Sequence, residues 1–486
     1  MPGLHLMSMS PASRTPQRDL LSGRISTTLM AFSLPTLGAA VLQSVNGSVN
    51  AVWVGHTLGE SALAATLNGN MILFLLMAFV FGAGQAAMIL VGKAVGADDL
   101  TEARRVMGTM VGAFAAASVV IAAVGFLASE QILRLLSTPP GAAEMALIYL
   151  RVVFLGLPAG LLVTLLMMAL RGAGDSLSPL WFTLLSVALD LALNPLLILG
   201  VGPFPRLGIA GSALAMTLAN AIALGAMVLW IYARDLPIRL GRDELGFLRP
   251  NPRLLGEVVG KGLPMGLQMI VMTVAAMSVL GLVNREGVLS TAAYSVAQQL
   301  WGYLQMPAMA VAAGVSAMTA QAIGAGDLER ARGIARSGIM ISLILTLGLV
   351  LAMLPLDAPL ISLFIGEDSL ALPEARHILW TASWGFPFMA VGTVLFAHAR
   401  AYGVVVRPLL ITIIAMFPLR LGFAFGAYGW LQADALWLSV PIGMASTCLL
   451  AAGLHALLSA RRSAQARTPS AAATAQAAEP SPLPLQ

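Results

Sequence analysis

The sequence predicts an all-α membrane protein whose twelve transmembrane helices form two six-helix bundles, related by a parallel pseudo-two-fold repeat. Three observations predict this fold class. Only 10% of the 486 residues are charged, whereas a soluble domain carries about 25%. Twelve apolar stretches reach the length of about 20 residues that crosses a hydrocarbon core. Finally, landmarks of the first half of the chain recur in the second half at a nearly constant spacing.

The apolar stretches give the expected helices in chain order. They lie at 25–54, 61–93, 104–129, 143–171, 178–200 and 209–233 in the first half, and at 256–284, 290–322, 334–356, 374–400, 406–428 and 435–459 in the second. The expected domains follow from them: an N-terminal lobe over 25–233, a charged cytoplasmic linker over 234–255, and a C-terminal lobe over 256–459. The ends, 1–24 and 460–486, are expected to be disordered because they are polar or rich in Ala, Pro, Ser and Gln.

The basic residues predict the orientation. With the N-terminus in the cytoplasm, 21 of the 27 Lys and Arg residues fall in inner loops and ends. Such an excess places both termini in the cytoplasm, and we expect a multi-pass protein of a bacterial inner membrane. Because the charges follow the alternation of the spans, the net charge of +5 does not indicate a nucleic-acid partner. The single cysteine, Cys448, provides neither a disulfide nor a thiolate metal site.

The internal repeat pairs landmarks of the two halves in the same order and at nearly the same offset. Pro35 corresponds to Pro264, and the loop at 96–104 corresponds to that at 324–332. Further anchors pair Pro158 with Pro387, Arg171 with Arg400, and Pro179 with Pro408. Since each half holds an even number of helices, both halves begin on the same side of the membrane. Transporters built from such repeats bind substrate between the halves, an analogy of architecture alone.

The repeated loop has a structural interpretation. Gly96 and Gly324 are predicted to adopt the left-handed conformation that ends a helix. Asp99 and Asp327 are predicted to cap the next helix, with Glu102 at capping-box spacing from Asp99. The alternative is that this loop makes a gating contact at the cytoplasmic face.

One acidic residue lies deep in a predicted span. An ionised group there costs about 2.5–3.5 kcal/mol on insertion scales. We therefore expect Asp190 to have a function or a specific partner. Asn194 lies one turn later, and Asn46 and Asn50 lie on a polar stripe of the first helix that begins at Gln43. We predict that Asp190, Asn194, Asn50 and Asn46 form a site for a proton or another cation. A satisfied interhelical hydrogen-bond cluster is the alternative.

A substrate cavity is predicted between the halves. Its candidate residues are polar or aromatic groups within the spans: Gln43, Gln268, Tyr294, Gln298, Trp301 and Arg420. The aromatic residues could instead pack against lipid or neighbouring helices. Arg420 is the other deep charge, and three alternatives stay open for it: lining the cavity, pairing with Asp190 across the cleft, or snorkelling to the outer interface.

Several motifs resemble those of the multidrug and toxic compound extrusion (MATE) family over about residues 25–460. They are Pro35, Val54 to His56, Leu63 to Ala65, Gly96 to Asp99, Leu170 to Asp175, Asn194 to Ile198 and Gly208 to Ala213. The resemblance implies a cation-coupled antiporter, driven by protons or sodium, that exports amphipathic and often cationic organic compounds. It also implies that lipid surrounds the protein, and we expect a monomer with no cofactor and no catalytic activity. The alternatives are a flippase for lipid-linked oligosaccharide or another lipid, and a receptor or scaffold that transports nothing.

The chain departs from the family pattern at three positions. Members commonly carry an aspartate where this chain has Asn50, and an Asn four residues before an Asp in the fifth helix. Here the order is reversed, with Asp190 before Asn194. Some members carry a glutamate in the seventh helix, where this chain has Met272. One deep carboxylate therefore remains, and a lone acid suits one proton better than a multidentate sodium site.

Overall fold

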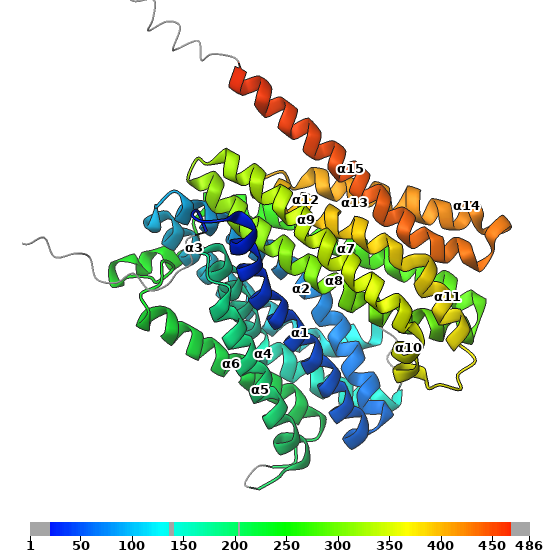
Figure 1. Cartoon of the computed structure of the whole chain (residues 1–486). Coiled ribbons are helices and arrows are strands. Elements are labelled where there is room, and N and C mark those ends of the chain that lie inside the picture. The colour runs from blue at the N-terminus through cyan, green and yellow to red at the C-terminus, as the bar shows by residue number, and fades with distance from the viewer. Residues whose placement is uncertain (1–19, 136–139, 203–204, 468–486) are drawn as a thin grey trace, which may run out of the picture.

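The computed structural model describes residues 20–135, 140–202 and 205–467. Within them, twelve helical spans are long and apolar enough to cross a membrane, which confirms the predicted fold class. The N-lobe consists of α1 (Ile25–Leu58), α2 (Glu60–Gly96), α3 (Leu100–Leu135), α4 (Pro140–Gly172), α5 (Leu177–Leu199) and α6 (Ile209–Ala233). Figure 1 shows this lobe in blue to green, beside the C-lobe in green-yellow to red.

The C-lobe repeats this pattern with several interrupted helices. It consists of α7 (Pro252–Glu286), α8 (Val288–Gly324), α9 (Leu328–Met353) with η2 (Leu354–Leu356) and α10 (Asp357–Ile365), α11 (Leu372–Ala382) with η3 (Ser383–Gly385) and α12 (Phe386–Ala401), α13 (Val406–Ile414) with η4 (Ala415–Leu421) and α14 (Gly422–Leu431), and α15 (Ala433–Arg467). The segment η4 is π-helical and contains Pro418. A proline cannot donate the regular helical hydrogen bond, which accounts for a local change of helix type.

Two predicted boundaries are wrong. The chain is ordered before residue 25, because Leu20 is buried and the Arg330 guanidinium donates to the carbonyls of Leu20 (3.0 Å) and Ser22 (2.7 Å). Helix α15 does not end near residue 459 but continues to Arg467. We call the end of the bundle where α1 begins and α15 ends the terminal face, and Figure 1 shows α15 projecting beyond it. The rest of the predicted disordered ends, 1–19 and 468–486, lies outside the described residues.

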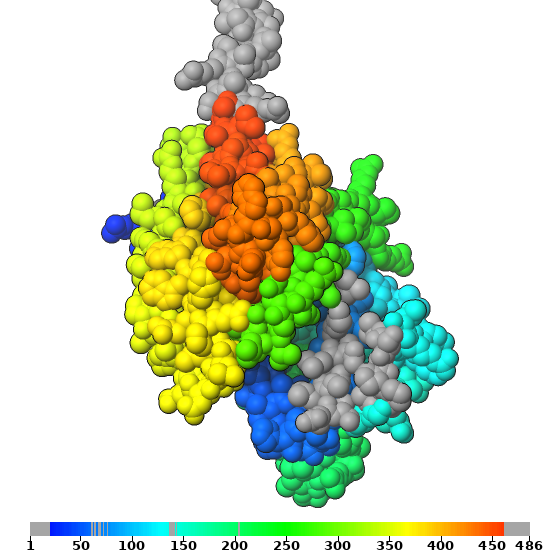
Figure 2. All heavy atoms as spheres, turned by 90° about the vertical axis from the view of Figure 1, so that its right-hand side faces the viewer, coloured from blue at the N-terminus to red at the C-terminus, as the bar shows by residue number. Residues whose placement is uncertain are grey.

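Near the terminal face, the lobes exchange the beginnings of their first helices. Leu29 and Phe32 of α1 lie in one buried cluster with Val311 of α8 and Val394 of α12. Correspondingly, Val258 of α7 lies in a cluster of N-lobe residues from α2 to α6. Figure 2 shows green α7 between the orange C-terminal helices and the N-lobe. Each lobe is therefore anchored in the other by the start of a helix.

The predicted linker is docked on the N-lobe. Its short 3-10 helix, η1 (Arg242–Leu248), packs so closely on α3 that a Cβ at Gly112 would lie 1.9 Å from the Leu248 carbonyl oxygen. Arg104 of α3 forms an ion pair of 3.2 Å with Glu244. The hydrogen bond from the Gly241 N–H, followed by the interaction with Arg104, holds the pKa of Glu244 below its ordinary value.

The two lobes meet in a seam of small residues at the terminal face. A Cβ at Gly96 of α2 would lie 2.1 Å from the Gln321 carbonyl oxygen, and a Cβ at Gly324 of α8 would lie 2.0 Å from the Lys93 carbonyl oxygen. Lys93 and Gln321 are equivalent positions of the internal repeat, as are Gly96 and Gly324. The pseudo-two-fold axis therefore passes between the ends of α2 and α8. Gly92 and Ala320, a further equivalent pair, face each other on this axis.

Further contacts extend the seam. Gly82 of α2 approaches the backbone of α7, where a Cβ would lie 2.2 Å from the Gly262 carbonyl oxygen. The Gln321 side chain donates a hydrogen bond of 2.9 Å to the carbonyl oxygen of Gly172, the last residue of α4. The closest approaches between the lobes thus lie in the half of the bundle nearer the terminal face.

The seam corrects the interpretation of the repeated loop. Gly96 and Gly324 are the last helical residues of α2 and α8, and the left-handed conformation is adopted by Asp98 (φ 57°) and Gly326 (φ 76°). Both predicted N-caps are confirmed: Asp99 Oδ1 accepts from the Glu102 N–H at 2.9 Å, and Asp327 Oδ1 from the Arg330 N–H at 2.8 Å. The Glu102 side chain pairs with Arg105 instead of completing a capping box.

Candidate functional site

The deep acid lies inside the N-lobe and is bonded to the polar stripe of α1. Asp190 of α5 is 3% exposed, and its Oδ2 accepts a hydrogen bond of 2.9 Å from Asn46 Nδ2. Asn194, which is fully buried, donates to the Asp190 backbone carbonyl at 2.9 Å. Three of the four predicted ion-site residues are therefore brought together at the contact between α1 and α5.

Several oxygen atoms of this cluster are buried without a hydrogen-bond partner. Asn46 and Asn194 each use one amide N–H in the two bonds just described. Asp190 Oδ1, Asn46 Oδ1 and Asn194 Oδ1 are buried and have no hydrogen-bond partner. A buried acceptor without a partner costs free energy, and a carboxylate in a span costs more.

The fourth predicted residue lies outside this cluster. Asn50 Oδ1 accepts a hydrogen bond of 2.9 Å from the Ser212 hydroxyl, which joins α1 to the start of α6. On the other side of Asp190, Ser186 of α5 donates to Asn220 Oδ1 of α6 at 3.2 Å. These bonds fix α5 and α6 around the acid. Sequence reasoning missed Ser212, because a serine near the start of an apolar helix is an ordinary packing residue.

The second deep charge lies inside the C-lobe. Arg420 of η4 is 8% exposed, so it does not snorkel to an interface. Its guanidinium interacts electrostatically with Tyr294 of α8, and its Nη1 lies 3.9 Å from Met416 Sδ. The stem packs against Gly443 of α15, where a Cβ would lie 2.8 Å from Arg420 Cδ. Sequence reasoning missed Gly443, since a glycine in an apolar helix gives no indication of its partner.

Two predicted cavity residues belong to a buried aromatic cluster. Tyr294 stacks with Trp437, and its ring lies edge-on to Trp301, both at 5.8 Å between ring centroids. Trp301 also contacts Phe386 and donates a hydrogen bond of 3.1 Å to the Ser383 hydroxyl. In this conformation Tyr294 and Trp301 pack against neighbouring helices, which was the alternative to a cavity, and both are at most 4% exposed.

The remaining candidates are not brought to one place. Gln268 is buried and donates to the Thr412 hydroxyl at 2.8 Å, within the C-lobe. Gln43 of α1 and Gln298 of α8 are exposed. In the described part of the chain, Asp190 and Arg420 form no ion pair with each other, and each has partners within its own lobe. The sequence thus grouped six residues that the structure distributes over both lobes.

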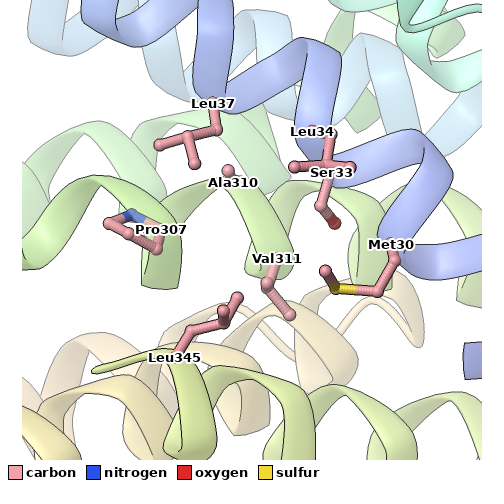
Figure 3. Close-up of a pocket in the computed structure, with 8 residues that line it drawn as sticks. All are labelled: Met30, Ser33, Leu34, Leu37, Pro307, Ala310, Val311 and Leu345. Carbon is pink, nitrogen blue, oxygen red and sulfur yellow. The ribbon is translucent and has the colours of Figure 1, made fainter. Parts of the chain in front are cut away.

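A small hollow lies between α1 and α8 near the seam. Figure 3 shows Ser33 and Leu37 of α1 facing Pro307 and Ala310 of α8 across it. It is apolar and holds about 10 Å³, which is at most the volume for one water molecule. It reflects looser packing than the corresponding contact between Gly82 and α7, and it is too small to hold an organic substrate.

The fold and the two sites define a class of protein. Two parallel six-helix lobes meet at one face, with a buried acid in one lobe and a buried arginine in the other, as in a two-lobed membrane transporter. The MatE family model matches residues 35–196 and again 264–425. The two matched segments have the same length and start at Pro35 and Pro264, which are equivalent positions of the internal repeat. The chain belongs to the MATE family and is a multi-pass efflux transporter.

Similar proteins support this assignment. The probable multidrug resistance protein YoeA of Bacillus subtilis is 32% identical over 87% of this chain and 92% of its own length. An FAD transporter of Shewanella oneidensis is 24% identical over 85% of this chain and 90% of its own length. The fold resembles a multidrug resistance MATE transporter solved in an outward-facing conformation, with a TM-score of 0.85, 21% identity, and coverage of 94% of this chain and 100% of that chain.

Proposed function

We propose that this protein is a cation-coupled antiporter that exports amphipathic organic compounds by alternating access between its lobes. The observation that carries the proposal is the bond between Asn46 and Asp190, within a buried cluster that has three unpartnered acceptor oxygens. One proton on the carboxylate, or one sodium ion bound by carboxylate and amide oxygens, would supply the missing positive partner. Asp190 is then the coupling residue, and Asn46 and Asn194 position it.

The seam supports an outward-facing state for this conformation. With both termini in the cytoplasm of a bacterium, as the basic residues predict, the terminal face is the inner face. The glycine contacts at Gly96 and Gly324 then close the inner side, and the conformation is outward-facing. Transport requires these contacts to open as the lobes rock. The chain is proposed to work as a monomer in lipid and without a cofactor.

Coupling is supported by the position of the acid rather than by its presence alone. Asp190 lies midway along α5 and bonds to α1, the helix whose first turns are anchored in the C-lobe. A change in the charge of Asp190 would alter the bond to Asn46 and hence the contact between α5 and α1. Ion binding at Asp190 would therefore affect the movement of the lobes through the contact between α5 and α1.

The test is counter-ion flux in proteoliposomes that contain the purified protein. A pH gradient and a sodium gradient are imposed separately, and rhodamine 123 is added as an amphipathic cation. Acceleration of ion movement by the dye under one gradient is the expected result, and it identifies the ion. If neither gradient responds, the antiporter is excluded. Translocation of a lipid analogue that ignores both gradients would favour the flippase.

A further inference from the structure

Arg420 is a buried cation for which the described chain provides no anion. Its ion pairs would have to come from Asp or Glu side chains, and none of the salt bridges among the described residues includes it. Its Nε is buried without a hydrogen-bond partner. Its contacts are a neutral phenol, Tyr294, and a thioether, Met416. Neither group balances a full positive charge within a membrane span.

The surroundings hold the guanidinium in place. Gly443 leaves room for the stem of Arg420, and Tyr294 is fixed by stacking with Trp437. The residue also lies in the π-helical segment η4, a helix type that occurs frequently at functional sites. The stem packs on α15 and Nε is enclosed, while 8% of the residue remains exposed. A ligand oxygen could therefore reach the guanidinium from one side.

We infer that Arg420 binds the anionic group of the cargo, and that the cargo class includes amphipathic organic carboxylates. An arginine fork recognises a carboxylate through paired N–H donors, and the apolar wall around Arg420 suits the rest of an amphipathic molecule. The inference rests on the proposed function, which places the coupling ion in the N-lobe. It adds that the cargo site is in the C-lobe. Cargo and ion then occupy separate sites and are exchanged by movement of the lobes.

The anion also changes the charge that moves in each cycle. Export of a monovalent anion in exchange for one inward cation moves two positive charges inward, whereas export of a monovalent cation moves none. A membrane potential that is negative inside would therefore drive export of the carboxylate and leave export of the cation unaffected.

The test compares two dyes that share a xanthene body and differ in charge, fluorescein as the carboxylate and rhodamine 123 as the cation. Binding is measured on the full chain in nanodiscs of phosphatidylcholine. We expect Arg420→Gln to weaken fluorescein binding by about tenfold or more, the effect of losing a charge-assisted pair, and to leave rhodamine 123 binding within about twofold. Arg420→Lys retains the charge but not the paired donors, so it should restore only part of the fluorescein binding.

Two further variants separate charge from folding. In Gly443→Ala the charge remains, but the new Cβ would displace the Arg420 stem, so fluorescein binding should fall selectively. Arg151→Gln is the matched control, because Arg151 is an N-lobe arginine whose Nε is also unpartnered and which lies over the Phe126 ring. It should leave binding of both dyes unchanged. Equal losses for both dyes in Arg420→Gln, or no saturable fluorescein binding by the wild type, would overturn the inference.

Two further experiments ask whether the anion comes from cargo or from lipid, and they separate a failure of the anion site from a failure of the antiporter. If phosphatidylglycerol in the nanodiscs displaces fluorescein, the site belongs to a lipid headgroup and the assignment to cargo is wrong. Asp190→Asn should keep fluorescein binding while ion-driven transport is lost. If the wild type shows no ion-driven transport but Arg420→Gln still loses fluorescein selectively, the antiporter fails and the anion site stands.

Discussion

Gly96 of α2 and Gly324 of α8 are related by the pseudo-two-fold axis, and each lies against the backbone of the residue three positions before the other. A Cβ added at Gly96 would lie 2.1 Å from the Gln321 carbonyl oxygen, and one added at Gly324 would lie 2.0 Å from the Lys93 carbonyl oxygen. Neither contact could exist with any other residue type. The two equivalent glycine contacts thus lie side by side, and together they pack the end of α2 against the end of α8 at the terminal face.

The first prediction concerns this seam. In Gly96→Ala, the new Cβ must push α8 away, and overpacking of this kind costs about 1–3 kcal/mol. Since about 1.4 kcal/mol is a factor of ten, opening of the seam should become about fivefold to a hundredfold more frequent. The measurement is maleimide labelling of Ala320→Cys, which is buried in the seam, in a Cys448→Ala background that removes the single native cysteine.

The control for the seam is Gly225→Ala. Gly225 lies within α6, and a Cβ there would meet no atom within 4 Å. Its labelling rate should equal that of the parent protein. A Gly96→Ala rate equal to that of this control would show that the seam does not hold the lobes together.

The second prediction concerns the segment before α1. Arg330 binds the carbonyls of Leu20, Ser22 and Gly23, so Arg330→Gln should free this turn from α9. Trypsin cleavage after Arg24, followed by mass spectrometry, should become faster. Arg336→Gln removes an exposed arginine of the same helix and should have no effect. Unchanged cleavage in Arg330→Gln would mean that packing of Leu20 alone holds the segment.

The third prediction concerns the docked linker. The pKa of Glu244 is held below its ordinary value by the Gly241 N–H and Arg104. The charged form is therefore favoured in the folded state, so its contribution is complete above the unfolded pKa of about 4.3 and is lost as the pH falls through the lowered pKa. Thermal melting between pH 3 and 7 should show this loss for the wild type. The melting curve of Glu244→Gln should lack this contribution, and identical pH profiles for the two proteins would contradict the assignment.

The sequence predicted the spans and the repeat well because both depend on local signals. Apolar length defines a span, and Pro35 and Pro264 mark equivalent positions without any knowledge of packing. Asp190 was predictable because a buried charge is rare. Its bond to Asn46 followed from the stripe on α1, whereas the bond between Asn50 and Ser212 required the position of α6.

The rest depends on which helices meet. The sequence predicts a left-handed conformation at Gly96 because glycine has two common uses, and only the position of α8 shows that close approach is the one used here. Tyr294 and Trp301 suit a cavity wall or a packed core equally well by composition. Their burial against Trp437 and Phe386 was decided by the helices α11 to α15, whose breaks were not predicted.

The central claim is that Asp190 is the residue at which an ion drives the cycle, and Asp190→Asn tests it most directly. The amide keeps the shape of the side chain but cannot take up a proton or carry the negative charge. Dye-dependent counter-ion flux is compared in proteoliposomes of the wild type, Asp190→Asn and Glu130→Gln, which alters an exposed acid paired with Arg134. We predict wild-type flux for Glu130→Gln and the flux of empty vesicles for Asp190→Asn, with dye binding retained. Wild-type flux in Asp190→Asn would contradict the account.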